Sequence, residues 1–325
     1  MGIPGDDPIY RNSDADMPSF VGVSTFLQSP LIQTPEGLKD EGVEVAIMGA
    51  PFDMGVVNRP GARFGPRAIR QAGYFGAPND DLYHMGLQVY PTDVLSVADF
   101  GDANCPPSSL ERSHEAIQTK VSQCLKAGAL PIVVGGDHSI TLPSATAVAN
   151  HYGPGKVGIV HFDAHADLRN SYNNNKFSHA SAIRRCLDDR NVSVISFGIR
   201  NISLTEIPFL KKNKKRIKIY WAKDKSSWNL NKFKKIISNK KVYLTFDVDG
   251  LDSSLMPATG TPEPGGLFWD ETIKIIKIAA QSSHIIGADI NELSPIKGFD
   301  SYNFLTAKLA YKIISYSFEF KKPRY

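Results

Sequence analysis

Short apolar runs rich in β-branched residues alternate with amphipathic segments from Val43 onward. The apolar runs predict eight strands, at Val43–Gly49, Val94–Phe100, Leu130–Val134, Val157–Phe162, Val192–Phe197, Ile217–Trp221, Val242–Phe246 and Ile285–Ile290. Apolar residues recur at helical spacing at Pro66–Ala72, Leu110–Ala127, Leu142–His151, Ala180–Leu187, Leu230–Ile237, Glu271–Ala280 and Tyr302–Ser315. Strands that alternate with helices predict parallel βαβ units, and therefore a doubly wound α/β sheet.

The first 42 residues lack this alternation and are polar and rich in Pro and Gly. We interpret residues 1–42 as an irregular arm, and residues 43–325 as a single domain with no internal repeat. The arm carries a few apolar residues that need a surface to cover them, namely Phe20, Val21, Phe26, Leu27 and Leu31. These residues predict that the chain forms a homo-oligomer in which the arm contributes to subunit contacts.

Three predicted strands end in residues that commonly bind metals. One strand leads into Asp163-Ala164-His165-Ala166-Asp167, another into Asp247-Val248-Asp249, and a third into Gly135-Gly136-Asp137-His138. A strand has a side-chain period of two, so the ligands of each run would share one face if the strand continued. In a parallel sheet the carboxyl ends of the strands meet at one edge. So many carboxylates at one place repel each other unless cations lie between them.

The residue types in this group suit first-row divalent ions. His138 and His165 are neutral donors, and Asp163, Asp167, Asp247 and Asp249 supply four negative charges. Four carboxylates balance two dications, and two adjacent ions can activate a shared water. The sequence therefore predicts a two-metal hydrolytic site.

Composition excludes several other classes of protein. The chain has 42% hydrophobic and 22% charged residues and a net charge of +4, as expected of a globular domain with a full core. Its three cysteines form no CxxC pair and favour a reducing, cytoplasmic location. The N-terminus lacks the basic and apolar regions of a signal peptide, and no run of 18 apolar residues predicts a membrane span.

Lysine is concentrated between Lys211 and Lys241. A nucleic-acid-binding patch is one interpretation of this stretch. We favour a solvated outer helix and loop, because the stretch has too few aromatic residues to stack successive bases. We therefore expect no nucleic-acid partner and no membrane partner.

The three motifs, in this order, resemble those of the ureohydrolase family, which contains arginases, agmatinases and related amidinohydrolases. The resemblance covers roughly residues 40 to 318. It implies a three-layer α/β/α fold around an eight-stranded parallel sheet, which agrees with the strand count. It also implies two Mn²⁺ ions per subunit, with Ni²⁺ as the alternative, hydrolysis of a guanidinium group to an amine and urea, and assembly into trimers or hexamers.

The resemblance also implies a role for individual residues. The metal ligands would be His138, Asp163, His165, Asp167, Asp247 and Asp249, with Asp163 and Asp247 bridging the ions and Asp167 also counted as catalytic. His179 would be the proton shuttle, Glu292 would pair with the guanidinium, and Thr261 would place a hydroxyl near it. Asn175 and Trp269 would contact the substrate. This chain departs from the family pattern at Ala180, where glycine is usual, and at Asn291, where relatives carry a hydrophobe.

Four further residues near these motifs are interpreted as structural. His161 lies one pleat back inside its strand, Asp137 precedes the histidine that the family uses, and Asp252 braces the loop after Asp249. Cys186 is expected to be a small buried hydrophobe.

The substrate tail is less strongly specified. The segment from Ala50 to Arg70 resembles the agmatinase branch and predicts agmatine as substrate. 4-Guanidinobutyrate and free guanidine remain alternatives, since Trp269 and Tyr172 could close the channel. The predicted rim is basic (Arg59, Arg63, Arg169 and Lys176 against Asp53 and Asp270), which disfavours a cationic tail. A metal-free binding protein is the alternative from another class, but it would lack ligands, and all six are present.

Overall fold

The structure of the chain, a computed structural model, describes residues 9–10, 21–73, 84–87, 91–153, 155–188 and 192–319. These residues form one sheet in the order β1-β2-β4-β3-β5-β10-β9-β6-β7-β8. The strands are β1 Ile9–Tyr10, β2 Leu31–Ile32, β3 Val45–Ala50, β4 Val97–Asp102, β5 Leu130–Gly135, β6 Val157–Phe162, β7 Val194–Phe197, β8 Ile217–Tyr220, β9 Lys241–Asp247 and β10 His284–Asn291.

The eight predicted strands are present as β3 to β10 and all pair in parallel. The α/β prediction is therefore confirmed. The sheet is wider than predicted because two short strands from the arm extend one edge. Strand β2 pairs in parallel with β4, and β1 pairs antiparallel with β2.

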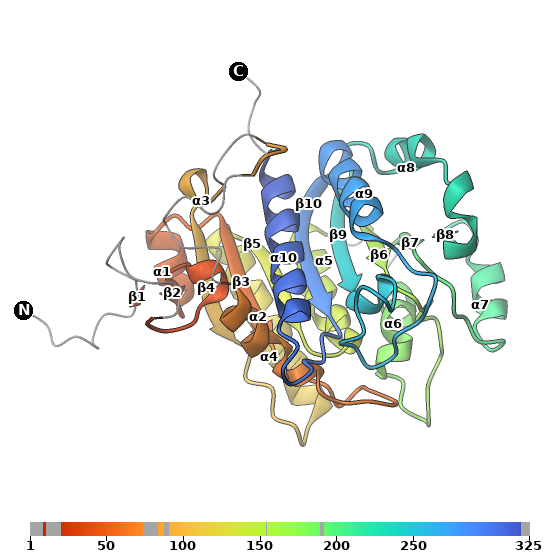
Figure 1. Cartoon of the computed structure of the whole chain (residues 1–325), viewed down its shortest axis with the longest axis horizontal. Coiled ribbons are helices and arrows are strands. Elements are labelled where there is room, and N and C mark those ends of the chain that lie inside the picture. Colours follow the sequence, from red (N-terminus) through yellow and green to blue (C-terminus); the bar gives the residue numbers. More distant parts are fainter. Residues whose placement is uncertain are drawn as a thin grey trace, which may run out of the picture.

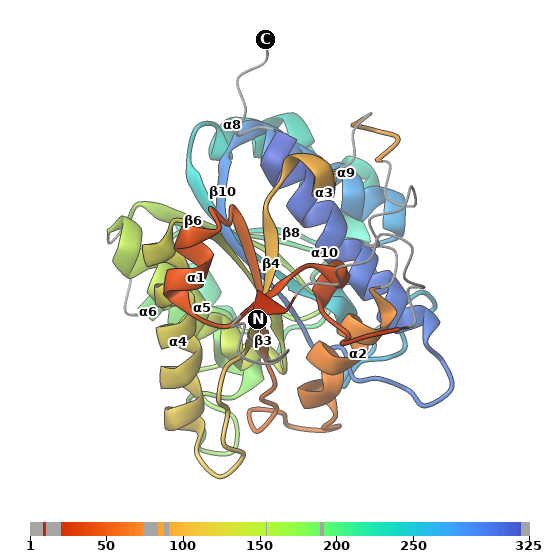
Figure 2. The same cartoon turned by 90° about the vertical axis from the view of Figure 1, so that its left-hand side faces the viewer.

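Helices cover both faces of the sheet and complete three layers (Figures 1 and 2). They are α1 Pro35–Asp40, α2 Gly65–Ala72, α3 Pro91–Val94, α4 Leu110–Ala127, α5 Thr141–Tyr152, α6 Ala182–Asp188, α7 Ile207–Lys212, α8 Leu230–Ile237, α9 Trp269–Ser282 and α10 Ser301–Glu319. The seven predicted helices are all present, whereas the short α1, α3 and α7 were not predicted.

The strand period of two separates the core into its two halves. Val45 and Ile47 of β3 join the apolar cluster beneath α2, α8, α9 and α10. Ala46 and Met48 face the other way, into the cluster beneath α1, α4, α5 and α6. Both faces of the sheet are therefore buried, which explains why its strands appear in the sequence as continuous apolar runs.

Local capping accounts for helix bounds that the sequence predicted well. The side chain of Ser109 accepts a hydrogen bond from the backbone N–H of Arg112 and caps the start of α4. Gly128 ends the same helix with a φ of 90°, a left-handed conformation that glycine adopts without steric cost. The predicted and observed bounds of α4 therefore coincide.

The arm differs from the irregular segment that we expected. Phe26 and Leu27 are buried in the core of their own subunit, and the N–H of Phe26 donates to Asp99 of β4 at 3.0 Å. The Arg70 guanidinium lies 4.0 Å from the centre of the Phe26 ring. The expectation that Phe26 and Leu27 need a neighbouring subunit to cover them is therefore wrong, whereas Phe20 lies outside the described residues.

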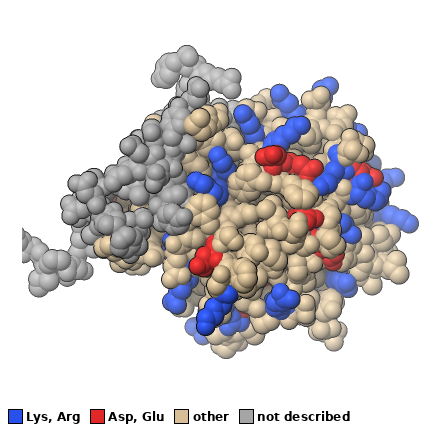
Figure 3. Space-filling model, viewed as in Figure 1, with Lys and Arg blue, Asp and Glu red and all other residues tan. Residues whose placement is uncertain are grey.

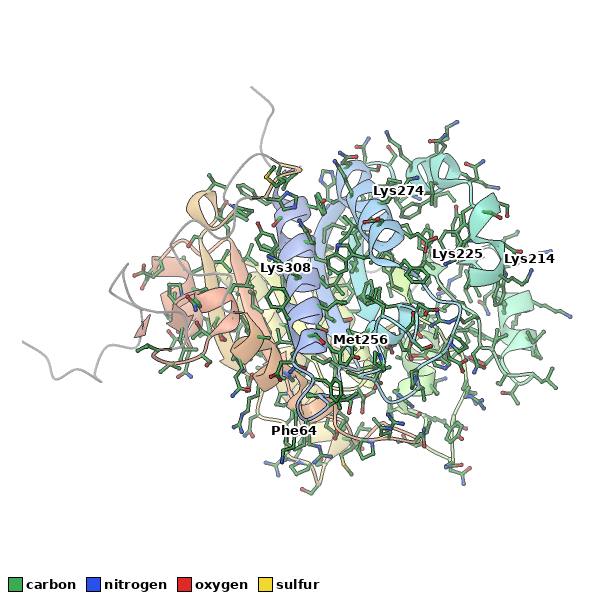
Figure 4. The ribbon with its side chains drawn as sticks, in the orientation of Figure 1. Phe64, Lys214, Lys225, Met256, Lys274 and Lys308 are labelled. Atoms are coloured by element: carbon green, nitrogen blue, oxygen red, sulfur yellow. The ribbon has the colours of Figure 1, made fainter. Side chains whose placement is uncertain are left out.

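The Lys-rich stretch lies at the β8 edge of the sheet, over α7 and α8, where basic side chains gather in the space-filling view (Figure 3). In Figure 4, Lys214 points away from the sheet at this margin. Helix α7 buries no residue, and α8 buries only Phe233 and Ile237. These features agree with a solvated outer layer. Among the described residues, no helix is long and apolar enough to cross a membrane.

The strand order brings the predicted ligands together. Strands β5, β10, β9 and β6 are consecutive neighbours, with Val134 beside Ile290, Asn291 beside Asp247, and Phe246 beside Phe162. All four strands point the same way and end at the lower side of the sheet in Figure 1. The segments that follow them therefore meet at one edge.

Candidate metal centre and catalytic pocket

His138 lies at the centre of the first group of ligands. It begins a 3₁₀ turn, η4 (His138–Ile140), just after β5. Its Nδ1 atom lies 3.1 Å from Asp163 Oδ2, 3.0 Å from Asp167 Oδ2 and 3.4 Å from Asp247 Oδ2. Three strand ends thus converge on one imidazole nitrogen.

His165 forms a second group beside the first. Its Nδ1 atom lies 3.1 Å from Asp249 Oδ2 and 3.5 Å from Asp163 Oδ1. Asp163 therefore presents one carboxylate oxygen to each histidine, as a bridging ligand must. The second predicted bridge, Asp247, reaches the His138 group through Oδ2, while its Oδ1 accepts the backbone N–H of Asp249 at 2.8 Å.

The chemistry of these groups fits two divalent cations. Nδ1 of His138 is buried and makes no hydrogen bond although three carboxylates surround it. Burial raises the pKa of Asp247 well above its ordinary value, and the nearby carboxylates of Asp249 and Asp163 raise it further. Burial and Asp163 also raise the pKa of Asp167. Without cations, some of the carboxylates would be protonated and neutral. Two dications would balance the charge of all four ionised carboxylates.

The residues expected to be structural hold these ligands in place. The His161 ring uses both nitrogens, with Nδ1 3.0 Å from Ser196 Oγ and Nε2 2.8 Å from Asp163 Oδ2. It therefore orients Asp163 and has no nitrogen left for a metal. Asp137 accepts the backbone N–H groups of Gly55 and Ser139 at 2.7 and 2.8 Å, which fixes the turn that carries His138.

Asp252 braces the loop after Asp249, as predicted. It accepts backbone N–H groups from Ser254, Gly265 and Gly266 at 3.0, 2.7 and 2.9 Å. These hydrogen bonds lower the pKa of Asp252 to about 2, the largest contribution coming from the Ser254 hydroxyl. Cys186 is buried in the apolar core, also as predicted.

Two residues of the site have strained backbones. Asp167 has a φ of 52° and Glu292 a φ of 67°, both in the left-handed region that favours glycine. Buried Glu206 stabilises the first turn, because its carboxylate accepts the N–H groups of Leu168 and Ser203 at 2.8 and 2.7 Å. Such strain persists only where surrounding contacts impose it, and it is common at functional sites.

His179 and Glu292 form a pair beside the ligands. His179 Nδ1 lies 2.8 Å from Glu292 Oε1, and its Nε2 accepts the backbone N–H of Val57 at 3.2 Å. Although burial favours the neutral ring, the Glu292 carboxylate raises the pKa of His179 to about 9. The ring is therefore suited to carry a proton near neutral pH. Within the described part of the chain, the side-chain hydrogen bonds of His179 go to Glu292 and Val57 and not to the six predicted ligands.

A cavity of about 180 Å³ opens above these groups. Its walls include His165, Asp167, Asp247, His179 and Thr261, all predicted site residues. The hydroxyl of Thr261 donates to Asp249 Oδ2 at 3.1 Å. Val57, Arg169, Tyr172, Asn201 and Ser203 also line the cavity, and of these Asn201 is exposed to solvent. Three of the six predicted ligands therefore share one pocket with His179 and the Thr261 hydroxyl, and the pocket has room for a small substrate.

Comparison with known proteins identifies the family. A model of the arginase family matches residues 43–318. The chain belongs to the arginase family. It is 36% identical to the human mitochondrial guanidino acid hydrolase over 285 residues, which is 85% of this chain and 77% of that protein. It is 34% identical to guanidinobutyrase of Pseudomonas aeruginosa, covering 86% of this chain and 87% of that one.

Solved structures agree with this membership in the arginase family. The structure of proclavaminate amidino hydrolase from Streptomyces clavuligerus superposes with a TM-score of 0.81 at 26% identity. The superposition covers 94% of this chain and all of that chain. The three-layer architecture of the family is therefore the architecture of this chain.

Two predicted substrate contacts of this arginase-family chain lie away from the pocket. Asn175 is turned back on its own loop, where its side-chain oxygen accepts the N–H of Phe177 at 2.8 Å. Trp269 is the first residue of α9 and packs against the apolar core. Neither residue lines the cavity, so the geometry does not support either contact. Tyr172, the other aromatic residue expected to close the channel, does line it.

Sequence reasoning missed a positioning arginine. The Arg200 guanidinium donates to the backbone carbonyls of Asp249, Leu251 and Glu263 at 2.7, 3.0 and 2.7 Å. It therefore holds the turn that carries the ligand Asp249. The only signal in the sequence was an arginine just beyond a predicted strand, which is too common to indicate this role.

A histidine outside the His179–Glu292 pair makes the stability of the fold depend on pH. His114 of α4 lies edge-on between two aromatic rings. The centre of its ring is 5.7 Å from that of Phe52 and 6.2 Å from that of Phe177. Burial lowers its pKa to about 4. Between that value and the ordinary value of about 6.5 the unfolded chain binds more protons. His114 therefore contributes stability above pH 6.5 that is lost as the pH falls toward 4.

Replacing His114 with Phe keeps an aromatic ring but removes the group that binds a proton at low pH. We expect the melting temperature of the His114→Phe variant to rise relative to the unmodified chain as the pH falls from 7 to 4.5. Thermal unfolding at matched pH values measures this difference. A difference that stays constant across the range would contradict the assigned cause.

Proposed function

We propose that the chain hydrolyses the guanidinium group of a small guanidino acid to an amine and urea. The reaction is that of a binuclear-metal amidinohydrolase, and the convergence of His138, His165 and four aspartates at the floor of one pocket carries this assignment. An inactive, metal-free homologue is disfavoured, because the six predicted ligands form two adjacent groups that Asp163 joins.

The six ligands would hold two divalent ions, which when bound lower the pKa of a water and polarise the guanidinium. Glu292 does not itself line the cavity, but it contacts His179, which does, and it offers the carboxylate that a planar guanidinium pairs with. Its hydrogen bond to Nδ1 orients the His179 ring, which when protonated would give a proton to the departing amine, its Nε2 exchanging the Val57 N–H for that amine. Asp167 and Thr261 line the same wall and orient the substrate beside the ligands.

The tail of the substrate meets Arg169 at the outer end of the pocket. Its guanidinium lies 5.0 Å from the centre of the Tyr172 ring, and no carboxylate of a described residue pairs with it. The carboxylate of Glu206, which also lines the pocket, is engaged because it accepts two backbone N–H groups. A free guanidinium attracts a carboxylate and repels an amine, which favours 4-guanidinobutyrate or a similar acid over agmatine.

Two named relatives support this preference, since one is a guanidino acid hydrolase and the other a guanidinobutyrase. Agmatine remains the competing substrate, because the sequence around Ala50 to Arg70 resembles that branch. Free guanidine is less well supported, since Trp269 does not line the pocket and the cavity extends outward to Arg169 and Ser203.

Urea release from 4-guanidinobutyrate and from agmatine, measured with Arg169→Gln and the unmodified chain, tests the tail assignment. We expect the variant to lose roughly 10- to 100-fold in kcat/KM for the acid, mostly through KM, because a charge-assisted contact disappears. Activity on agmatine should not fall. Lys176→Gln is the matched control, since Lys176 is an exposed cation of the same loop outside the pocket.

A preference of the unmodified enzyme for agmatine would overturn the carboxylate tail and leave the hydrolase assignment standing. Failure to release urea from either compound or from guanidine, with metal bound, would overturn the function itself.

We further propose two Mn²⁺ ions per subunit, with Ni²⁺ as the alternative, a homo-oligomer of trimeric or hexameric size, and a cytoplasmic location. Residues 43–325 would form one catalytic domain preceded by the arm. Val21 of the arm has an exposed apolar side chain that could take part in subunit contacts. A light-scattering mass equal to a single 35.7 kDa chain would contradict the oligomer.

A further inference from the structure

A buried polar network lies in the core directly behind His138. The Nε2 atom of His138, on the side of the ring away from the carboxylates, lies 2.9 Å from Thr245 Oγ1. Thr245 Oγ1 lies 3.1 Å from Thr141 Oγ1, and both hydroxyls are within 3.5 Å of Asn291 Nδ2. Asn291 Nδ2 in turn lies 2.7 Å from Asp289 Oδ1. All five residues are buried.

The donor and acceptor of the hydrogen bonds in this network can be assigned by starting from Asp289. Asp289 accepts the Tyr243 hydroxyl at 2.6 Å and the Asn291 amide at 2.7 Å, so its carboxylate is the acceptor at the end of the chain. The Asn291 amide group therefore faces Asp289 with its Nδ2, since its oxygen would be repelled there. Thr245 Oγ1 is left to accept a hydrogen bond from the Nε2–H group of His138.

A neutral imidazole carries its proton on one nitrogen only. If Nε2–H of His138 donates to Thr245, then Nδ1 is a lone pair aimed at Asp163, Asp167 and Asp247. A lone pair is what a metal ligand must present, and its orientation is set by the hydrogen bond on the far side of the ring.

We propose that Thr245 and Asn291 are positioning residues that hold His138 in its metal-binding tautomer and orientation, with Asp289 as the terminal acceptor. This inference rests on the two-metal site proposed above. Asn291 is the residue that departs from the family pattern. In this chain its amide links Thr245 to Asp289 by hydrogen bonds, which a hydrophobic side chain could not do. Gly135 permits it, because a Cβ there would lie 2.4 Å from Asn291 Oδ1.

The test measures metal affinity at each site and does not depend on turnover. Metal-free chain is titrated with Mn²⁺ against a chelating dye for the Thr245→Val, Thr245→Ser and Asn291→Leu variants. Thr272→Val is the matched control, because Thr272 is a fully buried threonine on α9 outside this network. Circular dichroism and thermal unfolding establish that each variant is folded.

We expect Thr245→Val to lower the affinity for one of the two ions by about 10- to 100-fold. The affinity for the other ion, held by His165, should be nearly unchanged. Thr245→Ser restores the hydroxyl and should restore affinity. Asn291→Leu should weaken the same ion. Unchanged affinity for both ions in folded Thr245→Val, or an equal loss in Thr272→Val, would overturn the role of Thr245, and unchanged affinity in Asn291→Leu would overturn that of Asn291.

Discussion

Replacing Asp163 with Asn will abolish urea release, by more than about 10³-fold, and will release bound metal. The carboxylate of Asp163 lies between the two groups, with Oδ2 near His138 and Oδ1 near His165. An amide in its place removes one negative charge and leaves a single ligand oxygen to serve two cations. Metal content and initial rates of urea formation, measured on the same preparation, give both results.

Asp224→Asn is the matched control, since Asp224 is a surface carboxylate, far along the chain from the predicted ligands, that pairs with Lys223. It should keep both metals and full activity. Asp247→Asn should also lose metal, because Asp247 faces His138 from β9. An Asp163→Asn variant that retained two tightly bound ions and near-normal turnover would contradict the binuclear assignment.

Replacing His179 with Asn should lower kcat by roughly 10²- to 10⁴-fold, the usual range for a general acid, and leave metal content unchanged. Asn can retain a hydrogen bond to Glu292 but carries no titratable proton. The pH profile should also change, because the pKa of His179, raised to about 9 by Glu292 against the effect of burial, no longer contributes.

His151→Asn serves as the control, because His151 lies at the exposed end of α5. Loss of metal in the His179→Asn variant would make His179 a ligand and exclude the role of proton carrier. Unchanged kcat with both metals bound would assign the proton transfer to another group.

The sequence was sufficient to predict which strands carry the ligands. A continuous apolar run such as Val157–Phe162 is typical of a strand in a sheet that is buried on both faces. Asp163 follows that run directly. The expectation that the strand would continue and place Asp163, His165 and Asp167 on one face was less accurate. Strand β6 ends at Phe162, and Asp167 lies in a turn with a left-handed backbone, so contacts from Glu206 bring it to His138.

Residues whose position depends on distant contacts were not predictable in the same way. Phe26 and Leu27 precede the regular alternation, and nothing local indicates that Asp99 and Arg70 would hold them in the core. Trp269 follows a glycine pair close to the ligand loop, yet its place at the start of α9 turns it toward the core. Hydrophobic pattern alone does not distinguish a pocket wall from a core contact.

The most direct test of the two-metal hydrolase is a titration of the metal-free chain with Mn²⁺ while urea release from 4-guanidinobutyrate and agmatine is followed. We expect activity on one of these compounds to rise until two ions are bound per chain and then to remain constant. Full activity at one ion per chain, or urea release with no ion bound, would contradict the binuclear site.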